Sequence, residues 1–352
     1  MFLEKNTFHQ ISEDQQLWSE DKLVMYLHDC LANNVDAIID FRLEGPCCLV
    51  NGLYTLLDNF CNHTGYLKNR ITIKTANMVE HHTEYNIEYV PEYWYEVSNI
   101  QEWLIDKNIH DNKTPAKHFG NFVGRSTWNR LWLSTLLDKH YSNKTLQTFH
   151  SSISSNYVLK QDSELNDCLG LDDLVSHKCN ILPNVVEFLE KCPITIDNDF
   201  YNIQKTKSEI VSQNDFYPIQ HPANLNILYF YENIFVDIIN ETRTAGNCFF
   251  VSEKTWRCIV ARRPFIVMGP QFFLANLKKL GFKTFSNYWN EEYDDFQEES
   301  RVQEIEKLIH VIATWDNQTL TETLSDMQNV LDYNFNKFKS LTYNDIKQVF
   351  TN

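Results

Sequence analysis

The chain has 352 residues, of which 43% are hydrophobic and 22% are charged, a composition typical of a folded globular protein and not of a disordered one. Its length predicts two domains, and its net charge of −16 disfavours a general nucleic-acid binder. The nine scattered glycines form neither a G-x-G-x-x-G nor a Walker A motif. This argues against a common dinucleotide dehydrogenase and against a P-loop NTPase.

The cysteine content and the distribution of apolar residues indicate the compartment in which the protein is expected. The nine cysteines are an odd number without a C-x-x-C pair, so we expect reduced thiols in the cytoplasm and not a disulfide framework. No run of 18 apolar residues occurs, so no membrane span is expected. The start MFLEKNTFHQ lacks an apolar region, so no signal peptide is expected either.

The first third of the chain alternates between helical and strand patterns. Leucine spacing predicts a helix over 19–33, and a short β-like run predicts a strand over 35–41 that ends in a turn. A second helix is predicted over 49–60 and a second strand over 70–74. Such alternation is typical of α/β layering.

A second α/β series follows the polar stretch 105–116, which predicts a linker. A short strand over 118–123 leads into a helix that starts near Trp128, and Ser126 is a candidate N-cap for that helix. The polar region 151–224 carries little pattern.

The most regular part of the sequence is 234–285. Strands are predicted over 234–239, 264–268 and 282–285, and helices from Ser252 onward and over 273–280. This βαβαβ order is typical of a doubly wound parallel sheet. Two closing helices are predicted, with apolar faces over 302–312 and 320–338.

These elements predict an α/β protein with two domains. We place an acceptor-side domain at 1–115 and a nucleotide-sugar donor-binding domain at 116–315. The remaining segment, 316–352, is expected to supply a helix that crosses back onto the first domain.

The tetrapeptide Ser252–Thr255 is the first candidate for chemistry. A strand brings the chain to this helix start, where backbone N–H groups and the positive end of the helix dipole favour an anion. Lys254 could meet a phosphate there, and Glu253 could accept hydrogen bonds from ribose hydroxyls. The alternative is an ordinary helix start, with Ser252 as N-cap and a solvated Lys254.

Two stretches around this helix start resemble a known family. FFVSEKTWR at 249–257 and RPFIVMGP at 263–270 resemble the signature of the α1,3-fucosyltransferases, and INET at 239–242 stands where those enzymes carry Phe-Glu-Asn-Ser. A looser set of uncharacterised viral and bacterial glycosyltransferase-like proteins is similar through LGFKTF at 280–285 and NFVGRSTWNR at 121–130. The resemblance implies the GT-B architecture, in which two Rossmann-like domains face a cleft.

The resemblance also implies roles for single residues. Arg125 or Arg130 would bind the donor diphosphate, Glu253 the ribose and Lys254 the phosphate. Glu241 would line the same pocket. A surface position for Arg130 and a structural role for Glu241 stay open. Since INET departs from the family's motif, guanine and fucose specificity does not carry over, and the donor is expected to be of GDP or UDP type.

The catalytic base is expected in the first domain. An inverting transfer needs a carboxylate that takes the proton of the acceptor, and the resembling enzymes supply it from the N-terminal side. Glu44, which follows the first predicted strand beside Asp40, is our candidate, and an exposed turn carboxylate is the alternative.

No metal is expected, because Arg and Lys would neutralise the phosphates. His81 and His82 are adjacent in a predicted strand, where neighbouring side chains point to opposite faces, so they do not form a metal site. The D-x-D at Asp197 and Asp199 mimics metal-dependent glycosyltransferases, but such a triplet arises easily in an acidic chain.

The sequence therefore predicts a metal-independent, inverting glycosyltransferase that acts without a further cofactor on a glycan or other hydroxyl acceptor. If the source is viral, the location becomes the host cytoplasm. One alternative is a non-catalytic nucleotide- or sugar-binding protein of the same fold. The other is a phage-type DNA-base glycosyltransferase, which the acidic balance disfavours.

Overall fold

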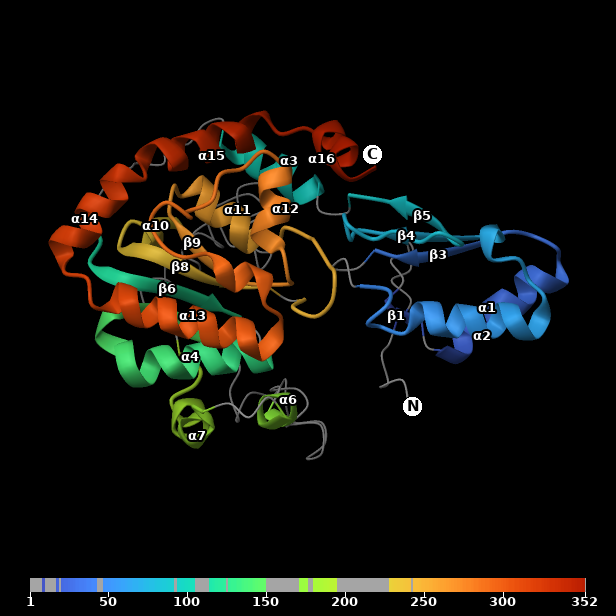
Figure 1. Ribbon diagram of the computed structural model, residues 1–352, viewed down its shortest axis with the longest axis horizontal. Helices are drawn as coiled ribbons and strands as arrows, with labels where there is room; N and C mark the ends of the chain where they lie inside the picture. Colours follow the sequence, from blue (N-terminus) through green and yellow to red (C-terminus); the bar gives the residue numbers. More distant parts are fainter. Residues whose placement is uncertain are drawn as a thin grey trace, which may run out of the picture.

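The structure is a computed structural model that carries the whole chain (Figure 1). It describes residues 8–9, 17–18, 20–42, 47–91, 94–104, 114–124, 126–149, 171–176, 180–194, 228–241 and 243–351. The described residues form a small lobe, residues 20–91, and a large lobe, residues 94–351. Each lobe holds a parallel sheet, so the predicted α/β class is confirmed.

The small lobe is built on a three-stranded parallel sheet in the order β3-β4-β5. Its elements are α1 (Glu20–Ala32), β3 (Ala37–Phe41), α2 (Leu53–Thr64), η1 (Lys68–Arg70), β4 (Ile71–Thr75) and β5 (Asn86–Tyr89). Both helices cover the same face of the sheet (Figure 1). Their leucines pack with Ile39 and Ile73 into a core of their own. An antiparallel pair, β1 (Phe8–His9) and β2 (Leu17–Trp18), adjoins this lobe.

Glycines set the bounds of α2. Gly52 before the helix and Gly65 after it have φ angles of 73° and 74°, a region that glycine enters without steric cost. The Gly65 amide donates to the Cys61 carbonyl and so satisfies one of the last carbonyls of the helix.

The large lobe is built on a four-stranded parallel sheet in the order β7-β6-β8-β9. Its strands are β6 (Lys117–Val123), β7 (Thr145–Phe149), β8 (Ile234–Asn240) and β9 (Phe265–Met268). β8 and β9 are buried along their whole length, as strands covered on both faces are. Nearly all their side chains are apolar, which is why the sequence pattern predicted them.

Helices cover both faces of this sheet. The helices are α3 (Trp94–Leu104), α4 (Trp128–Tyr141), η2 (Ser142–Lys144), α6 (Leu171–Ser176), α7 (Leu182–Glu190), α10 (Leu228–Tyr231), α11 (Glu253–Val260), α12 (Phe273–Lys279), η4 (Glu292–Asp295), α13 (Glu298–Ala313), α14 (Asn317–Asp326), α15 (Gln328–Ser340) and α16 (Tyr343–Thr351). In Figure 1, α4 and α13 lie on one side of the sheet and α11 and α15 on the other.

Two predicted elements and one predicted N-cap were wrong. Residues 282–285 form no strand, because side chains take up their backbone groups: Asn334 bonds the amide and the carbonyl of Lys283, and Glu291 bonds the amide of Phe285. The predicted closing helix over 320–338 is two helices, α14 and α15, which break at Met327. The residue that precedes α4 as its N-cap is Thr127 and not Ser126.

The C-terminal helices join the large lobe to the seam between the lobes. Gln101 of α3 donates to the carbonyls of Phe338 and Leu341, and Ile346 of α16 lines an apolar pocket with Met78 of the small lobe. The domain boundaries at 115 and 315 stay predictions. Among the described residues, no helix is long and apolar enough to cross a membrane.

Candidate functional site

The strand order of the large sheet singles out one position on its edge. The chain passes from β6 to β7 on one side and then returns to place β8 on the other side of β6. The connections that leave the carboxyl ends of β6 and β8 therefore diverge, and ligands of open α/β sheets bind in such a crevice. In this sheet the expected crevice lies between the carboxyl end of β6 and the segment that begins at Asn240 and Glu241.

Arg130 holds the two sides of this crevice together. It is only 6% exposed, although it lies on the helix body of α4. Its Nη2 donates to the Asn240 carbonyl at 3.2 Å, and the Asn240 side chain donates to Asn121 of β6 at 3.1 Å. The surface position that stayed open for Arg130 is therefore wrong.

Glu241 lies directly after β8, with 2% of its surface exposed. Its Oε1 accepts a hydrogen bond from Thr255 Oγ1 at 3.1 Å, whereas its Oε2 has no hydrogen-bond partner among the described residues. Burial raises the pKa of the Glu241 carboxyl, although Lys254 and Ser252 lie near enough to oppose the shift. The Glu241 carboxyl therefore lies at the sheet edge with one oxygen bonded to Thr255 and the other enclosed by the fold without a hydrogen bond, a position that is costly unless a partner is supplied.

The start of α11 brings Glu253 and Lys254 to the same edge. Ser252 is the N-cap, and its hydroxyl accepts from the Lys254 amide at 3.3 Å. Lys254 Nζ lies 2.8 Å from Glu253 Oε1, with side-chain exposures of 16% and 8%. Of the alternative reading of this helix start, the N-cap Ser252 is confirmed and the solvated Lys254 is wrong, because Glu253 orients the ammonium within a largely buried pair.

Two cations determine the charge of Glu253. Burial alone would raise the pKa of this carboxyl, but Lys254 and Arg257 outweigh burial and lower it to about 2. Lowering the pKa from about 4.3 in the unfolded chain corresponds to about 3 kcal/mol of stability that only the ionised group supplies.

Acid should therefore remove this contribution. Because the folded pKa is depressed, the stability is complete above about pH 5 and is lost as the pH falls toward 2. We expect Glu253→Gln to destabilise the protein at pH 7 and to approach the wild type in stability as the pH falls. Urea unfolding of both proteins at pH 7, 5, 4 and 3 measures this difference. A difference that does not change with pH would contradict the assignment.

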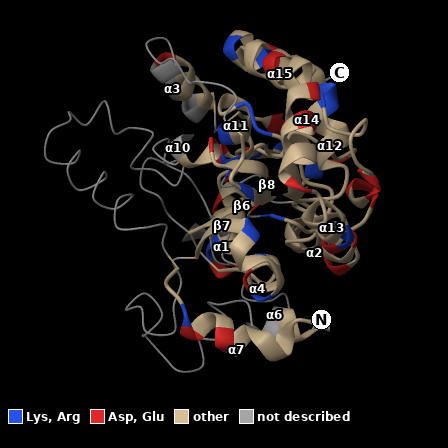
Figure 2. Cartoon of the chain, turned by 90° about the vertical axis from the view of Figure 1, so that its left-hand side faces the viewer, with Lys and Arg blue, Asp and Glu red and all other residues tan. Residues whose placement is uncertain are grey.

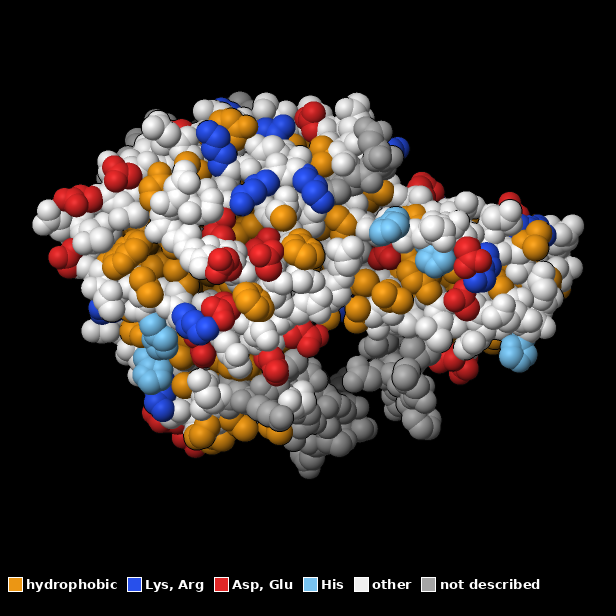
Figure 3. All heavy atoms as spheres, in the orientation of Figure 1, with side chains coloured by type: hydrophobic (Ala, Val, Ile, Leu, Met, Phe, Trp, Pro, Cys, Tyr) orange, Lys and Arg blue, Asp and Glu red, His pale blue; other side chains and the backbone are white. Residues whose placement is uncertain are grey.

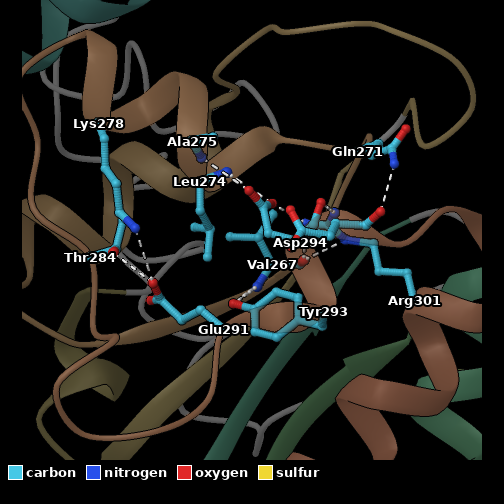
Figure 4. Close-up of polar contacts among 11 residues, drawn as sticks. Val267, Gln271, Leu274, Ala275, Lys278, Thr284, Glu291, Tyr293, Asp294 and Arg301 are labelled. Atoms are coloured by element: carbon cyan, nitrogen blue, oxygen red, sulfur yellow. Dashed lines mark hydrogen bonds and ion pairs between the residues drawn. The ribbon is translucent and has the colours of Figure 1, made fainter.

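The neighbouring helix start is already occupied by an anion of the protein itself. Asp294 of η4 accepts hydrogen bonds from the amides of Leu274 and Ala275, both at 3.0 Å, and Arg301 Nη2 pairs with it at 2.9 Å (Figure 4). A phosphate approaching the α12 N-terminus would meet this carboxylate. Of the two helix starts that follow β8 and β9, α11 is the one that presents a cation to a ligand.

The small lobe meets the large lobe beside this edge. Asn77 Oδ1 accepts from the Phe249 amide at 2.8 Å, its Nδ2 donates to the Asn247 carbonyl, and the Met78 amide donates to the Phe249 carbonyl at 2.9 Å. These bonds hold residues 247–249 against Asn77 and Met78 of the small lobe. In Figure 3 the two lobes form one continuous surface where they meet.

Sequence reasoning missed Glu80 at this junction. Its two carboxylate oxygens accept from Tyr54 Oη, Cys48 N and Asn77 Nδ2 at 2.8–3.0 Å. With both oxygens accepting hydrogen bonds from the fold, Glu80 is a structural centre of the junction. The one signal available was its position after the turn that follows β4.

Other candidates lie apart or outside the described residues. Glu44, Arg125, Asp197 and Asp199 are outside them. His82 lies in a loop and not in the predicted strand, and its Nδ1 accepts from the amides of Glu84 and Tyr85. Among the described residues, no three His, Cys, Asp or Glu side chains come together as a metal site requires.

A pocket of about 390 Å³ lies away from this edge, between α1 and α2 of the small lobe. It is lined by Glu20, Val24, His28, Leu56, Asn59, Phe60, His63 and Thr64. The residues that line it come from these two helices, and the charge at a helix start among them, Glu20 of α1, is an anion that disfavours a phosphate.

Comparison of the chain with protein-family models, curated proteins and solved structures found no match.

Proposed function

We propose that the chain is a metal-independent glycosyltransferase of the GT-B type, which transfers a sugar from a UDP or GDP donor to a hydroxyl acceptor. The observation that carries the proposal is the group formed by Glu241, Glu253 and Lys254 at the carboxyl edge of the large sheet. Two carboxylates and a cation are what a diol next to a diphosphate requires.

The contacts suggest how the donor is shared among these residues. Lys254, held by Glu253, meets the diphosphate at the start of α11, where the helix dipole adds to its charge. Glu253 then acts through Lys254, as a positioning residue. We assign the ribose hydroxyls to the unbonded Oε2 of Glu241, a role that the resemblance had implied for Glu253; because this oxygen is enclosed, the donor must displace the groups that cover it.

The overall acidity does not prevent a diphosphate from binding here. Figure 2 marks Lys and Arg positions in blue on α11 and α15, among helices that also have acidic positions. Arg257, one turn into α11, is 4% exposed and adds positive charge beside Glu253. A local cation in a nearly dry site acts on a phosphate far more strongly than distant carboxylates in water do.

In this proposal the acceptor enters from the small lobe, as the GT-B architecture requires. Glu44, our candidate for the base, comes three residues after the end of β3 in the sequence, and β3 lies in the small-lobe sheet. Glu80 does not compete for this role, because both of its oxygens are occupied.

Thermal unfolding with a nucleotide panel tests the donor site. We expect UDP or GDP, or their sugars, to add about 2.7 kcal/mol of stability when present at about 100 times the dissociation constant. CDP and the free nucleosides serve as controls. If no diphosphate shifts the unfolding midpoint, the donor-site proposal is wrong. Donor hydrolysis by the same panel then separates an enzyme from a protein that only binds nucleotide sugars.

A further inference from the structure

Phe272 combines a strained backbone with an exposed aromatic ring. Its φ angle is 63°, in the left-handed region that costs little for glycine but is unfavourable for a bulky side chain. Even so, 43% of its surface is exposed. A phenylalanine here adds strain without completing the core, since the next residue, Phe273, is fully buried and fills that place.

The surroundings of Phe272 hold it firmly in this conformation. Its amide donates to the Asp294 carbonyl at 2.8 Å, and its carbonyl accepts from the Asn276 amide at 2.9 Å. Asp294 is itself held by Arg301, and Gln271 donates to the Asp295 carbonyl at 2.6 Å (Figure 4). Such strain persists where the surrounding structure fixes it, and it is characteristic of functional sites.

Three other described residues besides the glycines have positive φ: Glu298 is the first residue of α13, and Asn34 and Arg262 have simpler explanations. Asn34 is of a type that tolerates this region, and its side chain accepts from Arg70 at 2.8 Å. Arg262 packs its guanidinium on the Phe335 ring at 4.1 Å and pairs with Asp332. For Phe272, no comparable contact compensates for the strain within the described residues, because 43% of its surface is exposed.

The position of Phe272 connects it to the donor edge. It follows β9, whose last residue, Met268, accepts a hydrogen bond from the Glu241 amide at 2.8 Å. A side chain at Gly269 would begin 3.5 Å from the Glu241 side chain, so this turn runs directly along the candidate site. Phe272 follows Gly269 by three residues, at most about 11 Å of chain, so its exposed ring lies within reach of a ligand bound at the candidate site.

We propose that Phe272 is a platform on which a pyranose ring stacks, an inference that rests on the proposed function and adds a sugar contact to it. The C–H face of a pyranose is apolar and flat, and a fixed aromatic ring offers it contact area at little cost in conformational entropy. The pyranose that stacks on Phe272 belongs either to the donor or to the acceptor, and both sugars present the same apolar C–H face.

Binding measurements on the full chain test the platform. The variants are Phe272→Gly and Phe272→Asn, which remove the ring and suit the left-handed backbone, and Phe272→Tyr, which keeps a ring. Tyr333→Ala, at a residue 42% exposed on α15, is the matched control. The probes are UDP, UDP-glucose, GDP, GDP-mannose, methyl α-D-glucopyranoside and methyl β-D-galactopyranoside. Calorimetry measures the binding of the nucleotides and nucleotide sugars, and saturation-transfer NMR measures the binding of the methyl glycosides.

We expect loss of the ring to weaken sugar binding about five- to tenfold and loss of Tyr333 to leave it unchanged. If the platform binds the donor sugar, the variants should bind UDP-glucose or GDP-mannose more weakly and bind UDP or GDP unchanged. If it binds the acceptor, only the binding of the methyl glycosides should weaken. Phe272→Tyr should restore binding. Phe272→Gly and Phe272→Asn should unfold no earlier than the wild type, because the strain is relieved.

The outcomes separate this inference from the proposed function. If nucleotides bind but removal of the ring changes no sugar affinity, the platform is wrong and the donor site stands. If glycosides bind through Phe272 but no nucleotide binds, the platform stands and the donor site is wrong. If the wild type binds neither, both are wrong. A clear loss of stability in Phe272→Asn would assign the ring to packing and overturn the inference.

Discussion

Replacing Lys254 by alanine is expected to weaken the binding of UDP or GDP about 10- to 150-fold, because a charge-assisted hydrogen bond of about 1.5–3 kcal/mol is lost. Free uridine and guanosine carry no phosphate, so their binding should not change. Calorimetric titration of wild type and variant with each diphosphate and each nucleoside measures the contrast.

The Lys254–Glu253 pair requires a second variant in this experiment. Removing the ammonium alone leaves a carboxylate 8% exposed beside Arg257, so Lys254→Ala should also lower the stability. Lys254→Ala combined with Glu253→Gln removes both charges and should recover much of that loss without recovering diphosphate affinity. This separates a loss of ligand contact from a loss of folded protein.

Lys307→Ala is the matched control for the lysine. Lys307 Nζ lies 2.6 Å from Glu304 Oε1 on α13, but its side chain is 69% exposed and it lies outside the candidate site. We expect unchanged diphosphate affinity in this variant. If Lys254→Ala binds diphosphates as tightly as Lys307→Ala does, the phosphate site lies elsewhere and the donor assignment is wrong.

Arg301→Met is expected to destabilise the protein by about 3–5 kcal/mol, because it leaves the buried Asp294 carboxylate without its cation. Arg301 is fully buried, and besides Asp294 it bonds the carbonyl of Val267 in β9. The same aspartate caps α12, so the variant should loosen the helix start that holds Phe272. Urea unfolding at pH 7 measures the change.

A double-mutant cycle tests whether the charge is the cause. Arg301→Met combined with Asp294→Asn removes both charges and should cost less than the sum of the two single variants. Lys307→Ala breaks an exposed ion pair on the same helix and should change stability by less than about 1 kcal/mol. If Arg301→Met unfolds at the same urea concentration as Lys307→Ala, the buried pair does not hold η4 and α12 together.

Elements whose apolar residues follow a clear period could be predicted well from the sequence. The leucine spacing of α1 predicted a helix over 19–33, and the structure has Glu20–Ala32. The apolar runs of β8 and β9 predicted buried strands, because a strand covered on both faces has little room for polar side chains. Gly281, with a φ angle of 89°, follows the end of α12 as expected.

Elements whose hydrogen bonds come from distant side chains could not be predicted this way. Residues 282–285 have a strand-like composition, but Asn334 bonds Lys283 from 51 residues away and holds the segment as a loop. Residues 247–249 are held by Asn77, about 170 residues earlier in the chain. Local composition carries no information about such partners.

The same distinction between local and distant determinants applies to the candidate site. The sequence by itself determined that Glu241, Glu253 and Lys254 lie at strand and helix ends, since local periodicity and capping residues mark those ends. Only the tertiary structure decided that Lys254 is paired and nearly dry, that Arg130 is buried across the crevice, and that Asp294 fills the α12 start. The reason is physical: the charge state and exposure of a side chain depend on what the folded chain packs around it, and those neighbours come from other elements.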